Sequence, residues 1–181
     1  MEHIIFDLEA TCWEGNILGR IQEIIEIGAL HIDAYGDVGS TFQKFVRPVH
    51  DPVLSPYCRN LTGISQDSVQ TARTFASVGK EFMHWIGDQT QGDYQMCSWG
   101  DKDHTLLVRA CSEVSLDHDW IEPYMDLKAE YHRIYNIYPK IGLRKALLRE
   151  GVEFDGNHHR ALDDARNLTT LFLKHFDVWT R

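Results

Sequence analysis

The sequence lacks the features that direct a chain into or across a membrane. No apolar run in its 181 residues approaches the ~20 consecutive residues that span a bilayer. The start of the chain, Met1, Glu2 and His3, does not combine a basic region with a following apolar stretch, so no secretory leader is expected. These absences predict a cytoplasmic protein.

Cysteine is scarce and dispersed. The cysteines of the chain are Cys12, Cys58, Cys97 and Cys111. Because they form no C-x-x-C pair, the sequence predicts neither a zinc ribbon nor a disulfide framework. We expect reduced thiols, most of them packed in the interior.

Positive charge is also in short supply. The chain has 18 Lys and Arg residues against 27 Asp and Glu residues, which gives a formal net charge of -9. A protein that coats nucleic acid nonspecifically binds phosphates through Lys and Arg, so this balance counts against that class. It does not count against an enzyme whose acidic residues hold divalent metal ions beside a few nucleotides.

The apolar pattern that is present predicts a folded chain with strands first. A hydrophobic share of 43% over 181 residues predicts one domain spanning residues 1–181. Alternating or continuous apolar runs predict strands at residues 4–8, 24–33, 41–48 and 94–100. The first three strands follow one another closely, so we expect them to form an antiparallel meander.

Helical spacing dominates the rest of the chain. A proline-containing stretch without periodicity, residues 49–69, predicts an ordered loop that leads into short helices. Apolar residues at helical spacing predict helices at residues 75–88, 103–114, 126–135, 143–151 and 161–176. Thr74 is available to cap the first of these helices. This order predicts an α/β or α+β fold with one mixed sheet flanked by helices.

The stretch "FDLEATCW" carries two acids inside a run that otherwise suits burial. Asp7 and Glu9 are two residues apart, so on a strand both carboxylates point to the same face. Two like charges that close repel one another, and uncompensated burial is costly. Either this strand end faces solvent, or a cation lies between the two acids.

Two further acidic clusters occur at predicted helix starts. Asp101 and Asp103 follow the strand at residues 94–100, where an acid can also serve as a helix cap. Asp163 and Asp164 are adjacent near the start of the final helix, about 100° apart around its axis. Only one of that pair can face a given site, and we expect the other to be solvated or bonded to a neighbouring arginine.

Histidines precede the last acidic cluster. His158 and His159 lie just upstream of Asp164, where an imidazole can stand beside a metal-bound carboxylate without being a ligand. That is the geometry that a general base requires. A histidine in a loop is more often a surface residue, and the dispersed acids around it favour the functional interpretation.

These motifs, in this order, resemble a known family. The chain is similar to the DEDDh (DnaQ-like, RNase T-like) 3′-to-5′ exonucleases, and in particular to their Eri-like and KapD-like branch. The three family motifs appear as "FDLEATCW", "SWGDKDHTLL" and "HRALDDARN". The segments between them, such as "RIQEIIEIGAL" and "LSPYCRNLTGI", resemble that branch too, so the resemblance covers nearly the whole chain. It implies a ribonuclease H-like fold with a mixed five-stranded sheet.

The resemblance also implies a metal site and a general base. Two divalent cations, Mg²⁺ or Mn²⁺, would be held by Asp7, Glu9, Asp103 and Asp164. The H-x4-D spacing of the third motif selects His159 as the base that takes a proton from the attacking water. In the second motif, apolar residues three and four positions later favour Asp103, and Asp101 is the alternative. We predict that His158 faces elsewhere.

The implied substrate is the 3′ end of a single-stranded nucleic acid. By the family pattern, Leu8, Ala10 and Thr11 offer backbone contacts and a hydroxyl to the terminal nucleotide. Leu61 and Trp99 are candidates to wedge or stack the last bases, with a role in the core as the alternative for each. No residue declares a contact to a 2′-hydroxyl, so RNA and DNA both stay open.

Two other functions remain to be separated from exonuclease activity. One is a catalytically silent scaffold of the same fold that binds nucleic acid or protein. The other is a hydrolase of very short oligonucleotides. The retained set of repelling carboxylates speaks against the silent scaffold. The sequence leaves open a protein partner or a homodimer.

Overall fold

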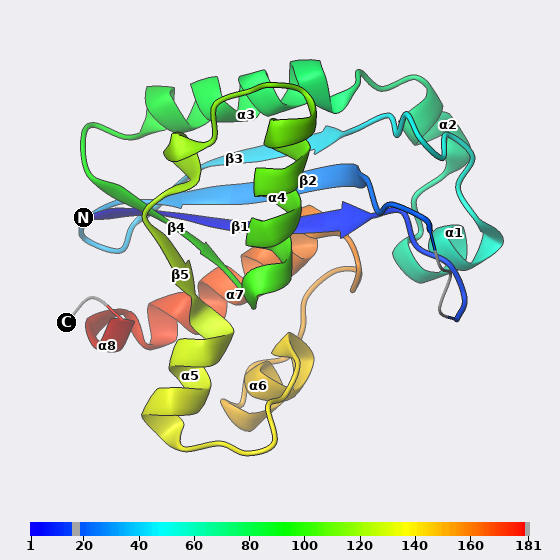
Figure 1. Ribbon diagram of the computed structural model, residues 1–181. Coiled ribbons are helices and arrows are strands. Elements are labelled where there is room, and N and C mark those ends of the chain that lie inside the picture. The colour runs from blue at the N-terminus through cyan, green and yellow to red at the C-terminus, as the bar shows by residue number, and fades with distance from the viewer. Residues whose placement is uncertain (16–18, 180–181) are drawn as a thin grey trace.

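A five-stranded mixed sheet forms the centre of the computed structural model, which describes residues 1–15 and 19–179 (Figure 1). The strand order is β3-β2-β1-β4-β5. The strands are β1 (Glu2–Ala10), β2 (Ile24–Ile32), β3 (Val38–Phe45), β4 (Tyr94–Ser98) and β5 (Tyr124–Asp126). The first three strands are antiparallel, whereas β4 and β5 continue parallel to β1. The predicted meander and mixed sheet are therefore confirmed.

The helices agree with the predicted spacing. The longer ones are α3 (Phe75–Gln89), α4 (Asp101–Glu113), α5 (Leu127–Tyr135) and α7 (Ala161–Lys174). The shorter ones are α1 (Pro56–Thr62), α2 (Gln66–Gln70), α6 (Leu143–Arg149), α8 (Phe176–Trp179) and a 3₁₀ turn at Asp119–Ile121. Among the described residues, no helix is both long and apolar enough to cross a lipid bilayer.

Two layers of helices bury opposite faces of the sheet. On β1, Ile4 and Phe6 belong to a core cluster with residues of α3 and α4, whereas Ile5 belongs to a second cluster with residues of α5, α6 and α7. Figure 1 shows α3 and α4 on one side of the sheet and α7 on the other. Because strand side chains alternate between faces, Asp7 and Glu9 share the α7 face with Ile5.

Neither of the two possible side-chain caps makes a capping hydrogen bond. Gly100 is the N-cap of α4, and Asp101 and Asp103 both lie in its first turn, so neither acid is the cap itself. Thr74 does occupy the N-cap position of α3, but its side chain makes no capping hydrogen bond.

The four cysteines are free thiols, three of them buried and Cys12 half-buried, as predicted.

Helix α7 begins directly against the backbone of β2. Gly28 lies opposite Asp7 in the sheet, and a Cβ added at Gly28 would be 2.2 Å from the amide nitrogen of Leu162. No side chain fits between the strand and the helix at this point. The missing side chain therefore lets the first turn of α7 approach the acids of β1.

This contact predicts the effect of adding a methyl group. Gly28→Ala should lower the free energy of unfolding by about 1–3 kcal/mol, because the first turn of α7 has to move away from β2. Gly87→Ala is the control, since an added Cβ at this exposed position in α3 meets nothing within 4 Å beyond its chain neighbours and the adjacent backbone of its own helix. That variant should gain about 0.5–1 kcal/mol. Urea denaturation measures both, and a Gly28→Ala protein as stable as wild type would contradict this packing.

Candidate functional site

Carboxylates from two elements converge at the end of β1. Asp7 and Glu9 lie on β1, and Asp164 lies in the first turn of α7. One potential ligand oxygen from each of the three lies within 4.8 Å of the others. Glu9 and Asp164 are 8% and 4% exposed, so the side chains are nearly enclosed by protein. The structure therefore brings together acids that are up to 157 positions apart in the chain.

Asp103 completes this group from the first turn of α4. The backbone N–H of Leu8 donates a hydrogen bond to the Asp103 carboxylate. Asp103 is also the strongest acidic neighbour of Asp7. Asp101, the alternative, lies two residues earlier in the same turn of α4 and is exposed. We call Asp7, Glu9, Asp103 and Asp164 the acid cluster.

Burial and mutual repulsion dominate the electrostatics of the acid cluster. Burial, followed by the charges of the neighbouring acids, raises the pKa of Asp7 well above its ordinary value. The same causes raise the pKa of Glu9 to about 8. Burial raises the pKa of Asp103 to about 7, although the hydrogen bond from Leu8 acts in the opposite direction. An all-oxygen donor set with this excess of negative charge fits a hard divalent cation.

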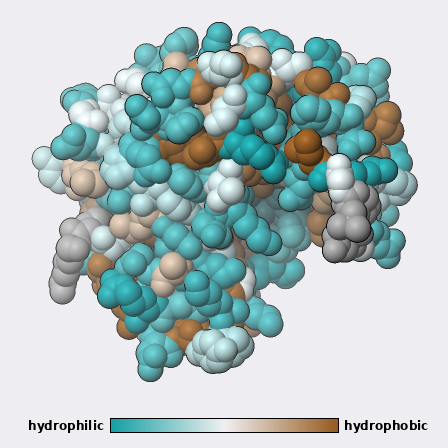
Figure 2. Space-filling model, viewed as in Figure 1, coloured by the Kyte–Doolittle hydropathy of each residue, from teal (hydrophilic) through white to brown (hydrophobic). Residues whose placement is uncertain are grey.

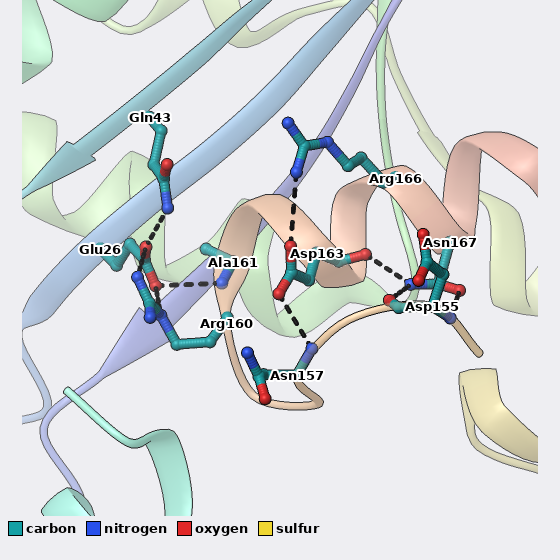
Figure 3. A network of polar contacts seen from close by, with 9 residues as sticks. All are labelled: Glu26, Gln43, Asp155, Asn157, Arg160, Ala161, Asp163, Arg166 and Asn167. Atoms are coloured by element: carbon teal, nitrogen blue, oxygen red, sulfur yellow. Dashed lines mark hydrogen bonds and ion pairs between the residues drawn. The ribbon is translucent and has the colours of Figure 1, made fainter.

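A buried ion pair anchors the start of α7 beside the acid cluster (Figure 3). Glu26 on β2 is fully buried and accepts two hydrogen bonds from Arg160, at 2.9 and 3.0 Å. It also accepts hydrogen bonds from the Ala161 backbone N–H and the Gln43 amide. The Arg160 charge compensates Glu26, so this acid can be buried next to Glu9. Glu26 was not predicted to belong to the site. The available signal in the sequence was a single acid within the apolar run "IIEIGAL".

A second network fixes the loop before α7 (Figure 3). The Asp163 carboxylate accepts a hydrogen bond from the Asn157 backbone N–H and contacts Arg166 at 3.5 Å. Asn167 bonds both the backbone N–H and the carbonyl of Asp155. Asp163 thus faces away from the acid cluster and contacts an arginine, as predicted for one of the two adjacent aspartates. The network sets the course of the chain through His158 and His159.

The two histidines are arranged differently from the prediction. His158 was expected to face elsewhere, but its Nδ1 lies 2.9 Å from Oδ1 of Asp164. His159 contacts the same carboxylate through its backbone N–H, at 2.7 Å. The physical reason is the left-handed backbone of His159, with φ of 66°, which turns two adjacent side chains to one side. Their rings stack with centroids 3.9 Å apart.

Two cavities meet at the acid cluster. The first cavity, about 570 Å³, lies towards α1 and α4 and includes Asp103 in its lining. The second cavity, about 470 Å³, lies towards α6 and includes Asp7 and Asp164. Leu8, Glu9 and His159 line both. In Figure 2 the surface is hollowed between the part that carries α1 and the lobe of α5 and α6.

The residues predicted to contact substrate are distributed between these cavities, with one exception. Leu8, Ala10 and Leu61 line the first cavity, and Trp99 lines the second. Thr11 is the exception, because it is 2% exposed and its hydroxyl accepts a hydrogen bond from the Glu23 backbone N–H. Its hydroxyl is therefore not presented to either cavity. The cavities are also lined by cations that were not predicted as site residues, Lys102, Arg109, Lys140, Arg144 and Lys145.

Comparison with known proteins identifies relatives of the chain along nearly its whole length. The RNase_T family model, described as "Exonuclease", matches residues 4–172. ERI1 exoribonuclease 2 of Danio rerio is 38% identical over 188 aligned positions, which cover 93% of this chain and 34% of that protein. The 3′-5′ exoribonuclease 1 of Mus musculus is 31% identical, over 94% of this chain and 51% of that protein. The chain thus spans about a third to a half of the length of these relatives.

Solved structures share the fold. The nuclease domain of 3′hExo, described as a DEDDh family member bound to rAMP, superposes with a TM-score of 0.90 at 29% identity. The match covers 97% of this chain and 92% of that domain. Exonuclease I, at 16% identity and a TM-score of 0.78, shows the likeness of fold alone. The family match, the five-stranded mixed sheet and the convergent acids lead to one conclusion: the chain belongs to the DEDDh, RNase T-like family of 3′-to-5′ exonucleases.

Proposed function

We propose that this exonuclease uses divalent metal ions to hydrolyse the terminal phosphodiester of single-stranded RNA or DNA, and that it releases 5′-mononucleotides. The observation that carries the proposal is the convergence of four carboxylates where two cavities meet. A phosphodiester lying over the acid cluster would have one cavity for the leaving nucleotide and one for the remaining strand. In this proposal Asp7, Glu9, Asp103 and Asp164 hold two ions, Mg²⁺ or Mn²⁺, because hard cations prefer oxygen ligands.

The metals supply charge neutralisation of the phosphoryl oxygens and support for the leaving 3′ oxygen when they are bound. The residues of the chain provide the remaining functions. The Leu8 N–H orients the Asp103 carboxylate, and the His158 ring orients the Asp164 carboxylate. The nearly complete burial of Glu9 and Asp164 limits the water that reaches these carboxylates.

His159 is the proposed general base. Burial, the neighbouring His158 and Arg144 lower the pKa of His159, while Asp164 acts in the opposite direction. A lowered pKa keeps the imidazole neutral near pH 7, so that one ring nitrogen can accept a proton from the attacking water. Its position in the lining of both cavities supports this role, since the scissile phosphate would lie between them.

The relatives favour RNA as substrate. Two curated relatives are named exoribonucleases, and the 3′hExo domain was solved with rAMP. A further similar structure, at 28% identity over 97% of this chain, is described as 3′-end-specific recognition of a histone mRNA stem-loop. We extend from these proteins only the chemistry that they share, which is binding of a nucleic-acid 3′ end. Single-stranded DNA stays the alternative substrate.

The raised pKa values predict how stability depends on pH without metal. The folded state keeps a proton on Glu9 up to about pH 8, whereas the unfolded chain releases it near pH 4.5. The folded state therefore binds more protons, and in EDTA the free energy of unfolding should fall as pH rises across this range. Urea denaturation at pH 5.5, 6.5 and 7.5 measures this slope.

Glu9→Gln should flatten that slope, whereas Glu153→Gln at an exposed site should leave it as in wild type. Mn²⁺ should stabilise the wild type more at pH 7.5 than at pH 5.5, because metal binding displaces protons from the acid cluster. A wild-type stability that rises with pH in EDTA would contradict the protonated acid cluster.

The second-motif aspartates give a direct test of the proposed activity. With a 5′-labelled 20-mer and Mg²⁺, the wild type should produce a ladder shortened from the 3′ end, and EDTA should abolish it. Asp103→Ala should lose at least ~10³-fold in rate, because removal of a metal carboxylate costs several kcal/mol of transition-state stabilisation. Asp101→Ala is the matched control from the same helical turn and should be far milder. Undiminished cleavage in excess chelator, or the reverse ranking of the two variants, would overturn the assignment.

Alanine variants of the adjacent histidines separate the base from its neighbour. His159→Ala should slow single-turnover cleavage by ~10² to 10⁴-fold, the usual share of general-base catalysis, and should remove the rising limb of the pH–rate profile. His158→Ala should keep that limb, because the ring of His158 only orients Asp164. Calorimetry should find Mn²⁺ affinity nearly intact in His159→Ala. Loss of the limb in His158→Ala instead would transfer the role of base to His158.

A further inference from the structure

Three cations line the second cavity together with residues of the acid cluster. Lys140 lies in the loop before α6, and Arg144 and Lys145 lie in its first turn. All three are exposed, and all three line the same cavity as Asp7 and Asp164. We call Lys140, Arg144 and Lys145 the cationic rim. One continuous hollow therefore runs from the acid cluster to an array of positive charge.

The cationic rim belongs to a segment whose charge differs from that of the rest of the chain. Residues 127–149 contain six Lys and Arg residues and a single acid, Glu130, in a chain with a net charge of -9. The surface over α5 and α6 is largely hydrophilic in the view of Figure 2. Local positive charge of this kind attracts polyanions even when the whole protein is acidic.

The charges of the cationic rim are not used by the fold. Arg133, in the same segment, pairs with Glu130 at 2.6 Å, and Arg160 pairs with Glu26. Among the described residues, the cationic rim forms no such ion pair. The guanidinium of Arg144 is held 5.8 Å from the centroid of the Phe154 ring, which positions it without neutralising it. These three cations remain free to bind an external anion.

The first cavity has a different chemistry. Leu8, Ala10 and Leu61 contribute apolar surface to it, which suits a nucleobase. Of the two basic residues that line it, Arg109 is engaged by the protein, since it donates to the Gln22 carbonyl and lies 3.6 Å from Glu113. Lys102 is therefore a single exposed charge there, not a row of charges. A leaving mononucleotide needs one apolar site for its base. The remaining strand carries a phosphate at every nucleotide and needs a row of cations.

We propose that the cationic rim binds backbone phosphates of the strand on the 5′ side of the scissile bond, so that the enzyme prefers a polynucleotide to a dinucleotide. The proposal rests on the proposed function, because the acid cluster defines where the scissile bond lies. Tyr138, in the same loop, is 95% exposed and offers an aromatic face to a base of that strand. The cationic rim thus selects substrates by length rather than by sequence.

Two triple variants with equal charge change test this role. The test variant is Lys140→Gln, Arg144→Gln and Lys145→Gln. The control is Lys128→Gln, Arg133→Gln and Arg149→Gln, which removes three charges of the same segment outside the cavity. Circular dichroism and melting temperature verify that both variants fold.

The first readout is the salt dependence of binding. Fluorescence anisotropy of a labelled single-stranded 20-mer in EDTA gives the slope of log K against log [KCl]. Each lost phosphate contact should flatten this slope by about 0.7, so the test variant should differ from wild type by about 2 and the control should not. Equal slopes in the two triple variants would overturn the proposal.

The second readout is the ratio of kcat/KM for the 20-mer to kcat/KM for a dinucleotide, measured in Mg²⁺. This ratio should fall at least tenfold in the test variant and stay unchanged in the control. An unchanged ratio in the test variant would overturn the role of the cationic rim. Cleavage by the wild type would still support the proposed function in that case. Conversely, a wild type that binds the 20-mer with the expected change of slope but cleaves nothing would refute the proposed function and support the cationic rim as a strand-binding surface.

Discussion

The first turn of α7 rests on the bare backbone of β2, and the geometry of the site follows from that contact. Gly28 leaves no side chain between the two elements. Glu26, two residues earlier on the same face of β2, binds Arg160 and the Ala161 amide at the helix start. Steric closeness and a buried ion pair thus act together, and they carry Asp164 to the carboxylates of β1.

This rigid support explains how the fold tolerates a cluster of buried acids. Repulsion among Asp7, Glu9 and Asp103 would favour their separation, and it raises their pKa values instead because the sheet and two helices hold them in place. The fold therefore stores an unfavourable electrostatic arrangement that a divalent cation can relieve. Packing elsewhere in the two cores offsets this cost.

Local patterns predicted the parts of the site that depend on local geometry. The two-residue spacing of Asp7 and Glu9 gave their common face, and helical spacing gave the start of α7 at Ala161. The partnership of Glu26 with Arg160 spans 134 residues, and the direction of His158 depends on one left-handed residue, so neither follows from periodicity. Strand β5 has only three residues, too few to show alternation. A single domain over residues 1–181 stays a prediction.

The two ends of the described chain lie together, at the end of the sheet remote from the site. Met1 and Trp179 line one cavity, and Figure 1 shows the N-terminus and α8 on the same side of the molecule. The acid cluster lies towards the opposite end of β1, at Asp7 and Glu9. A molecule tethered to a bead, a sensor chip or an optical-trap handle through either end would therefore present its cleft to the surrounding solution.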